Sequence, residues 1–378
     1  MANRYRPTVV EIDLGALRQN FQFAKSSLPR GAEILAVVKA NAYGHGDLEI
    51  SKTLIEEGVH QIGVAILEEA VGLRAGGIQT PIIILTGIDQ PEFKDVVQYQ
   101  ATPVLWNRDI IKTFHDYLKR NDLTSPVFIK VDTGMHRLGV TFDQFSNLCR
   151  LLKGLSRFHL KCLMTHLAIS EEPENALTKQ QLKLFEEAIG VAKEYGLEFE
   201  RFGVGNSGAI LNRLFTEMEA SKLLVRPGIM LYGSTPSPRL PGMEQLKPVM
   251  HFKTAIHDIK KVKKGESIGY GATFKATEDM RMGVLPVGYA DGYHRHFSNR
   301  AEVLVQGKRA RVVGNVSMDL TTIDLSNIPE ARVGDEVILL GSQGKETISA
   351  WDLANIMGTI PYEIFCGVSP RVPRIYRD

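Results

Sequence analysis

The sequence predicts an α/β fold in which a closed (β/α)8 barrel is followed by a mainly antiparallel β domain. From residue 8 to about residue 232, short apolar runs alternate with amphipathic segments, which indicates parallel strands joined by crossover helices. Residues 234–248 then hold four prolines and no periodic pattern, as a linker does. The runs beyond this linker are short, rich in β-branched residues and bounded by glycines. We therefore expect two domains, residues 1–240 and residues 241–378.

The first domain contains nine strand-like runs, one more than a closed barrel needs. We assign the first run to another sheet and expect it to pair with the C-terminal domain. The remaining eight runs would form a barrel of the TIM type. A doubly wound open sheet stays open as a second arrangement of the same pattern. The runs are Thr8–Ile12, Ile34–Lys39, Gln61–Ile66, Pro81–Thr86, Thr102–Trp106, Val127–Val131, His159–Thr165, Glu200–Gly203 and Leu223–Pro227.

The remaining elements follow from the same periodicities. Helices are expected at Leu14–Ser27, Asp47–Glu57, Arg108–Lys119, Asp143–Leu152 and Lys179–Tyr195. In the second domain, strands are expected at Thr254–Val262, Met282–Val287, Glu302–Gln306, Arg311–Val313, Thr321–Leu325 and Glu336–Leu340, with one short helix at Ile348–Met357.

Composition excludes several classes of function. The 45 basic and 43 acidic residues are spread along the chain and give a net charge of +2, without the basic stripe of a nucleic-acid-binding protein. Three scattered cysteines, Cys149, Cys162 and Cys366, do not form a disulfide framework or a zinc motif, so we expect no metal. The first residues lack the apolar core of a signal peptide, and no apolar run reaches membrane-spanning length. We expect a soluble, cytoplasmic protein.

Lys39 marks the first candidate site, because it follows an apolar strand directly and precedes the turn Ala-Asn-Ala-Tyr-Gly-His-Gly. A strand lysine ordinarily extends its stem to reach water. A desolvated amine with a lowered pKa would instead be suited to form a Schiff base. The stretch alone leaves both interpretations open.

Two further stretches lie where a barrel carries its chemistry, at the carboxyl ends of the last two strands. Residues 203–208, Gly-Val-Gly-Asn-Ser-Gly, have small side chains that let backbone N–H groups approach an anion at the start of a helix. Arg226 ends the last strand and begins Arg-Pro-Gly-Ile-Met-Leu-Tyr. These positions favour a phosphate site over an ordinary tight turn.

These motifs resemble those of bacterial alanine racemases, which are pyridoxal-phosphate (PLP) enzymes with a barrel and a C-terminal β domain. The resemblance covers nearly the whole chain and follows the family's order. The matching stretches are VVKANAYGHG around Lys39, VDTGMHRLGV at 131–140, THLA at 165–168, GNS at 205–207, RPGIMLYG at 226–233, GYGATF at 269–274, VGYADGY at 287–293 and SMD at 317–319.

The resemblance implies how the cofactor is bound. Lys39 would be its covalent anchor, Arg226 would face its pyridine nitrogen, and His166 would stack near the ring and orient Arg226. A permanent cation beside that nitrogen disfavours its protonation and weakens the cofactor's pull on electrons. The cofactor phosphate would be held by residues of the glycine-rich turns and two tyrosines: Tyr43, Ser207, Gly228, Ile229 and Tyr362. Asn206 would also bind the cofactor.

Racemisation removes a proton from one face of Cα and returns one on the other face, so it needs two acid/base groups. Lys39 would serve one face. By resemblance, Tyr270 of a partner subunit would serve the other, which makes a homodimer with shared sites necessary. The substrate would meet Arg137, Met318, Asp319 and Tyr289. Lys130 matches a lysine that some members carbamylate, and it would then fix Arg137.

Two positions depart from the pattern, because Asn315 stands where many members carry arginine and Glu171 where many carry aspartate. Both map to the substrate entrance. The expected activity is racemisation of alanine, supplying D-alanine for peptidoglycan. Serine, lysine or broad-specificity racemisation on the same scaffold is the first alternative, and a PLP-dependent decarboxylase or a non-catalytic PLP-binding protein is the second.

Overall fold

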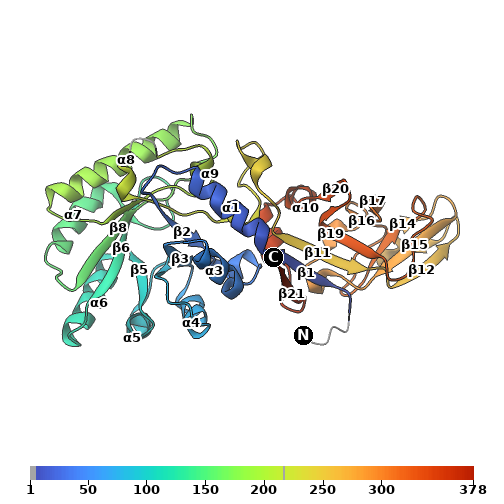
Figure 1. The fold of residues 1–378 in the computed structure, drawn as a ribbon, viewed down its shortest axis with the longest axis horizontal. Helices are drawn as coiled ribbons and strands as arrows, with labels where there is room; N and C mark the ends of the chain where they lie inside the picture. Colours follow the sequence, from blue (N-terminus) through green and yellow to red (C-terminus); the bar gives the residue numbers. More distant parts are fainter. Residues whose placement is uncertain (1–5, 216–217) are drawn as a thin grey trace.

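A computed structural model of the chain describes residues 6–215 and 218–378. It forms two parts that lie side by side, a barrel built from the first half of the chain and a β domain built from the second half (Figure 1). One continuous cluster of buried apolar residues includes members of both parts. The predicted two-part architecture is confirmed.

The barrel is closed, which excludes the open doubly wound sheet. Eight parallel strands follow one another around it, and the pairing of β10 with β2 together with that of β5 with β6 completes the ring. Each predicted barrel strand overlaps an observed one. The strands are β2 (Glu33–Val37), β3 (Gln61–Val64), β4 (Ile82–Ile84), β5 (Ala101–Leu105), β6 (Ser125–Asp132), β8 (Phe158–Met164), β9 (Arg201–Gly203) and β10 (Leu223–Val225).

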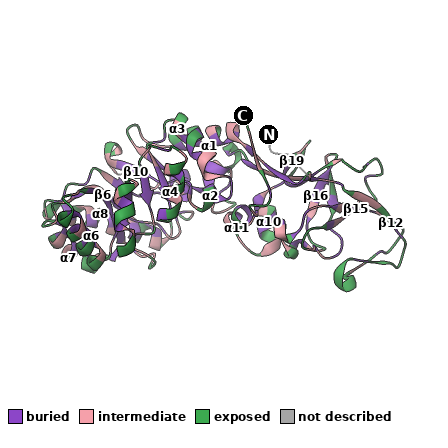
Figure 2. Ribbon diagram, turned by 90° about the horizontal axis from the view of Figure 1, so that it is seen from below, coloured by how far each residue is buried: buried purple, intermediate pink, exposed green. Residues whose placement is uncertain are grey.

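Helices surround the barrel, with buried strands such as β6 and β10 inside and more exposed helices such as α6 outside (Figure 2). The five predicted helices are present, within three residues at each end, as α1 (Leu14–Ser26), α3 (Asp47–Glu56), α6 (Arg108–Arg120), α7 (Phe142–Leu152) and α8 (Ala176–Glu194). Further short elements were not predicted: α2 (Lys39–Tyr43), α4 (Leu67–Ala75), α5 (Phe93–Gln98), β7 (Val140–Thr141) and α9 (Ser207–Leu211).

The strand left over from the barrel, β1 (Val9–Asp13), belongs to the main sheet of the β domain. It runs antiparallel to β11 (Met250–Ala255) and parallel to the last strand, β21 (Arg374–Arg377). The other strands of this sheet are β16 (Glu302–Val305), β17 (Lys308–Arg311), β19 (Glu336–Gln343) and β20 (Glu346–Ile348). The sheet therefore joins the first and the last strand of the chain.

The β domain corrects three expectations. The run Thr254–Val262 is two strands, because the chain turns at Ile256 and His257 and continues as β12 (Asp258–Val262) in a separate sheet with β15 (Met280–Leu285) and β18 (Thr321–Asp324). The strand expected at Arg311–Val313 ends at Arg311, since residues 308–311 are the ones that pair with β16. Besides α10 (Ala350–Met357), the domain contains a second helix, α11 (Pro361–Cys366).

A small hairpin of β13 (Ser267–Ile268) and β14 (Phe274–Lys275) carries residues 270–272 at its tip. In Figure 1, β14 lies at the end of the β domain that is far from the barrel. The hairpin therefore lies far from the chain's own barrel.

Candidate active site

Charged and polar side chains gather at the carboxyl ends of the barrel strands. Lys39 follows β2, Lys130 lies near the end of β6, His166 follows β8 and Arg226 follows β10. Parallel strands of a closed barrel end on one face, so these residues converge there. Burial, and after it the positive charges of Arg226, Lys130 and Lys39, lower the pKa of His166.

Lys39 starts a left-handed turn. The four residues after it, Ala40 to Tyr43, all have φ between 51° and 54°, and none is glycine. Such a conformation costs roughly 1–2 kcal/mol per residue relative to the right-handed one, so surrounding contacts must hold it. The Lys39 amine is largely buried, and burial followed by the charge of Arg137 lowers its pKa. A larger fraction of this amine is therefore neutral at neutral pH than in an ordinary lysine.

A small concave surface lies where β9 and β10 end. The Ser207 hydroxyl accepts hydrogen bonds from the backbone N–H groups of Gly228 and Met230, at 3.1 and 3.3 Å. The Asn206 side chain caps the short helix that begins at Ser207 by accepting from the Ala209 N–H at 3.1 Å. A Cβ atom on Gly228 would lie 2.4 Å from the Tyr43 hydroxyl, so this position requires glycine.

Two tyrosine rings close this surface from different parts of the molecule. Tyr43 comes from the left-handed turn and Tyr362 from α11 of the β domain, and their ring centroids are 5.7 Å apart. Burial raises the pKa of both hydroxyls, so they stay protonated and can donate hydrogen bonds. Tyr362 thus ties the β domain to the barrel mouth of its own chain.

Arg226 is buried and only partly paired. Its Nη2 donates to the Thr165 carbonyl oxygen at 2.6 Å and lies 3.5 Å from Nδ1 of His166. Its buried Nη1 atom has no hydrogen-bond partner within the described residues. Burial lowers the pKa of this guanidinium to about 10, so it is a cation at neutral pH. An unpaired buried N–H donor is costly, which makes Nη1 a site for an acceptor atom.

Lys130 and Arg137 extend the cationic wall. Burial, then the charges of Arg226 and Arg137, lower the pKa of Lys130 to about 8. Arg137 itself is exposed and has no hydrogen-bond partner within the described residues. Its guanidinium is therefore available to a carboxylate or to a negatively charged group at Lys130.

These features fit PLP. The Ser207 hydroxyl and the backbone N–H groups of Gly228 and Met230 form a cradle of groups that suit a phosphate, the unpaired Nη1 of Arg226 offers a donor for a ring nitrogen, and the desolvated Lys39 amine can bind an aldehyde carbon. The cradle, the donor and the amine all lie at the same end of the barrel.

The structure separates the remaining predicted residues from this group. Tyr270 lies at the hairpin tip and is 72% exposed, while Tyr289 and Met318 are 42% and 53% exposed. Asp319 is paired with Arg371 at 2.7 Å. All four residues belong to the β domain, and β14 of the hairpin lies in the part of that domain that is far from the barrel (Figure 1). A single chain therefore does not bring Tyr270 to Lys39.

The two residues that depart from the family pattern, Asn315 and Glu171, each act on a tyrosine of the candidate site. Asn315 donates from Nδ2 to the Tyr270 carbonyl oxygen at 2.7 Å and so supports the hairpin tip. The negative charge of Glu171 contributes, after burial, to raising the pKa of Tyr362. Each position can thus affect the site through a neighbouring tyrosine.

Sequence reasoning missed two residues that support the Lys39 turn. The Glu69 carboxylate accepts from the N–H groups of Ala40 and Ala65, at 2.6 and 2.7 Å, and so ties the turn to the end of β3. His45 lies directly beneath the turn and is fully buried. Its place between two glycines in the turn motif was a signal for a packed role, but the motif does not reveal its contacts.

Among the residues that the structure describes, no group of three or more His, Cys, Asp or Glu side chains could hold a metal ion. Within the same ranges, no helix is both long enough and apolar enough to cross a membrane.

Comparisons with known proteins give one consistent result. A family model described as "Alanine racemase, N-terminal domain" matches residues 12–236, and one described as "Alanine racemase, C-terminal domain" matches residues 249–376. The chain is 39% identical to the alanine racemase of Halothermothrix orenii over 373 residues, which cover 99% of this chain and 97% of that protein.

Solved structures agree. The crystal structure of alanine racemase from Bacillus anthracis with bound L-Ala-P matches with a TM-score of 0.91 and 34% identity, covering 100% of this chain and 96% of that one. The crystal structure of alanine racemase from Bartonella henselae with covalently bound pyridoxal phosphate matches with a TM-score of 0.86 and 27% identity, covering 98% and 99% of the two chains.

Proposed function

Because the chain belongs to the alanine racemase family, a family of PLP-dependent isomerases, we propose that it interconverts L-alanine and D-alanine by a two-base mechanism. The observation that carries the proposal is the grouping of a desolvated lysine, a buried arginine with an unpaired Nη1 and a glycine cradle at one end of the barrel. These groups match the aldehyde, the ring nitrogen and the phosphate of one cofactor.

When bound, PLP supplies an electron sink that lowers the barrier to removal of the Cα proton of an amino acid. Lys39 would anchor it, Arg226 with His166 would face the ring, and the phosphate would lie among Tyr43, Asn206, Ser207, Gly228, Ile229 and Tyr362. The depressed pKa of His166 supports a neutral imidazole, whose Nδ1 can accept from Arg226 without adding a second positive charge.

The proton steps belong to two residues of the chain. The neutral Nζ of Lys39 accepts the Cα proton on one face, and the hydroxyl of Tyr270 from a second copy of the chain donates a proton on the opposite face. The reverse reaction uses the same groups in opposite roles. The lowered pKa of Lys39 supports its role as a base at neutral pH.

Substrate binding would use the cationic wall and the second copy. The exposed guanidinium of Arg137 suits the alanine carboxylate. Met318, Asp319 and Tyr289 would approach from the second copy together with Tyr270, which is supported by their exposure on the β domain. Carbamylation of Lys130 would place a negative charge beside Arg137 and fix its guanidinium.

Chiral analysis of the product tests the activity. The purified, PLP-loaded protein would be incubated separately with L-alanine, L-serine and L-lysine, and the enantiomers of each would be separated over time. We expect D-alanine to form fastest and to approach an equal amount of L-alanine. If another amino acid reacts faster, the proposed mechanism stands but alanine is not the preferred substrate. Release of carbon dioxide would favour a decarboxylase.

Replacing Tyr270 by phenylalanine distinguishes a racemase from a non-catalytic PLP-binding protein. A racemase loses turnover while its PLP absorbance persists, because the missing hydroxyl is a proton donor and does not hold the cofactor. Tyr117→Phe, on α6 of the barrel, is the matched control. Unchanged turnover in Tyr270→Phe would contradict the two-base assignment.

We also propose that the protein acts in the cytoplasm and supplies D-alanine for peptidoglycan. Expression of the chain in a bacterium that requires external D-alanine should restore growth without it. Growth restored equally by the Lys39→Ala variant would contradict this role.

A further inference from the structure

The left-handed turn from Ala40 to Tyr43 links two groups that the proposed cofactor site needs. Lys39 stands at its beginning and the Tyr43 hydroxyl at its end. All four residues have positive φ without being glycine, so contacts outside the turn must stabilise it. The question is which side chain does so.

His45 makes the contacts that this role requires. Its Nδ1 atom lies 3.0 Å from the carbonyl oxygen of Ala42 and 3.0 Å from that of Tyr43. Both oxygens are acceptors, so Nδ1 carries the hydrogen and donates to consecutive carbonyls of the turn. Burial lowers the pKa of this imidazole to about 3, which keeps it neutral. Its Nε2 atom has no hydrogen-bond partner within the described residues.

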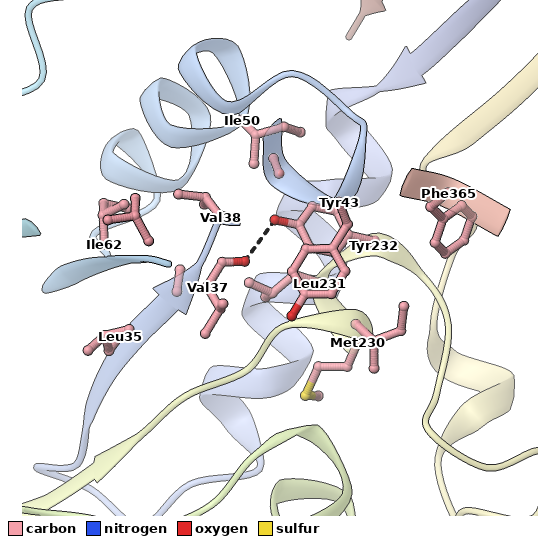
Figure 3. Close-up of a cluster of buried hydrophobic side chains, with 14 of the residues drawn as sticks. Leu35, Val37, Val38, Tyr43, Ile50, Ile62, Met230, Leu231, Tyr232 and Phe365 are labelled. Carbon is pink, nitrogen blue, oxygen red and sulfur yellow. Dashed lines mark hydrogen bonds between the residues drawn. The ribbon is translucent and has the colours of Figure 1, made fainter. Parts of the chain in front are cut away.

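The imidazole ring is itself fixed by aromatic neighbours from the barrel and the β domain. Its centroid lies 4.6 Å from that of Tyr232 and 5.1 Å from that of Phe365. Tyr232 also packs against Tyr43 at 4.8 Å and donates its hydroxyl hydrogen to the Val37 carbonyl oxygen of β2 at 2.9 Å (Figure 3). His45 therefore connects the turn to a rigid aromatic cluster beneath it.

We propose that His45 is a positioning residue, which holds the left-handed turn by donating its Nδ1 hydrogen to the two carbonyls and thereby places the Tyr43 hydroxyl and the Lys39 amine for the cofactor. This inference rests on the proposed function for its consequence on PLP. The effect on the turn itself does not depend on the cofactor. His45 acts through the backbone of the turn and is not assigned a contact with a reacting atom.

Three substitutions distinguish the effect of the Nδ1 hydrogen-bond donor of His45 from the effect of the volume of its ring. In His45→Asn the amide nitrogen replaces Nδ1, in His45→Gln the donor moves to the position of Nε2, and His45→Leu has no donor. His115→Leu is the matched control, because His115 is also buried with an unpaired Nε2 but lies on α6 of the barrel.

Two measurements are made on each variant. Hydrogen exchange is followed for amides 42, 44 and 46, which donate within the turn, in the protein with its PLP removed. The dissociation constant of PLP is then measured by absorbance titration. We expect His45→Gln and His45→Leu to accelerate exchange and to weaken PLP binding by about tenfold or more, and His45→Asn to stay within about threefold of the wild type.

The outcomes are distinct. Equal loss in all three variants would mean that ring volume matters and the Nδ1 donor does not, which overturns the proposal, as would no loss in any. If His45→Leu does not fold, the comparison of His45→Asn with His45→Gln still decides. A wild-type protein that fails to bind PLP would overturn the proposed function, while the exchange rates would still test whether His45 holds the turn.

Discussion

The candidate site residues at the barrel mouth are mostly buried, whereas those of the β domain are mostly exposed. In the barrel, Lys130 and Arg226 are buried, Lys39 is largely so, and the pKa of each is shifted by that burial and by neighbouring charges. In the β domain, Tyr270 and Met318 are mostly exposed, and their side chains face solvent in the single chain.

This difference supports the proposal that the barrel binds the cofactor and that the β domain supplies groups to the site of a second copy of the chain. A buried cation with an unpaired donor is expensive unless a ligand completes it. Tyrosine and methionine side chains are enriched at the surfaces by which proteins contact one another. The two ends of the molecule therefore complement each other, which a symmetric pair of chains would use.

The largest expected effect comes from removing the barrel's amine. Lys39→Ala should lose at least about 10³-fold in racemisation rate, because it lacks both the cofactor anchor and one base. The visible absorbance of bound PLP should disappear as well. A variant that retains this absorbance would show that another residue anchors the cofactor.

Mixing two inactive variants tests whether the barrel of one chain and the β domain of another form one site. Lys39→Ala and Tyr270→Phe are co-expressed, so that mixed dimers contain one site with both wild-type residues. If the sites are shared between chains, the mixture should regain about a quarter of the wild-type activity. Activity no higher than the sum of the two parents would place Lys39 and Tyr270 in the same chain's site.

A several-fold effect is expected at Lys130. Carbon dioxide adds to a neutral amine, and a pKa of about 8 makes the neutral form more abundant at mildly alkaline pH than in an ordinary lysine. Carbamylation should therefore rise from about pH 7 to about pH 9. Activity should fall after dialysis without carbon dioxide and return with bicarbonate, and Lys130→Gln should lose this response. Activity that does not respond to the removal of carbon dioxide or to bicarbonate would contradict the idea.

The smallest effects are expected at the entrance. Asn315→Arg removes the hydrogen bond to the Tyr270 backbone, and Glu171→Asp withdraws the carboxylate from Tyr362 by one methylene. We expect changes within about tenfold in the ratio of kcat/KM for alanine and serine, with PLP affinity unchanged. A loss of PLP binding in either variant would assign these residues to the cofactor site instead.

The sequence was sufficient for the barrel because most strands there are short apolar runs that are largely buried, such as β4 and β5. The β domain was harder. β11 and β12 appear as one run, since Ile256 and His257 at their junction include no glycine or proline to signal the break. The helix α11 was missed although Pro361 stands at its first position, because six residues show too little periodicity.

The site shows a similar limit. Two glycines predicted a tight turn after Lys39, and Gly44 and Gly46 do have positive φ. The same conformation at Ala40 to Tyr43 contradicts the helical preference of alanine, so only tertiary contacts explain it. One such contact comes from Glu69, which is 29 residues away from Ala40 in the chain. The hydrogen bonds of His45 to the turn are local, but its ring is held by Tyr232 and Phe365, so no sequence pattern specifies this arrangement.

The position of β1 has a consequence for how the protein is made. This strand leaves the ribosome first, yet its neighbours in the sheet, β11 and β21, are synthesised after the barrel and at the very end of the chain. The barrel strands β2 to β10 can close before either neighbour exists, whereas residues 9–13 must remain unpaired until β11 has been made, and they gain their second neighbour only with the last strand of the chain. A fragment that begins at residue 241 would lack the strand that lies between β11 and β21, and a synthetic peptide of residues 6–13 should therefore rescue its folding.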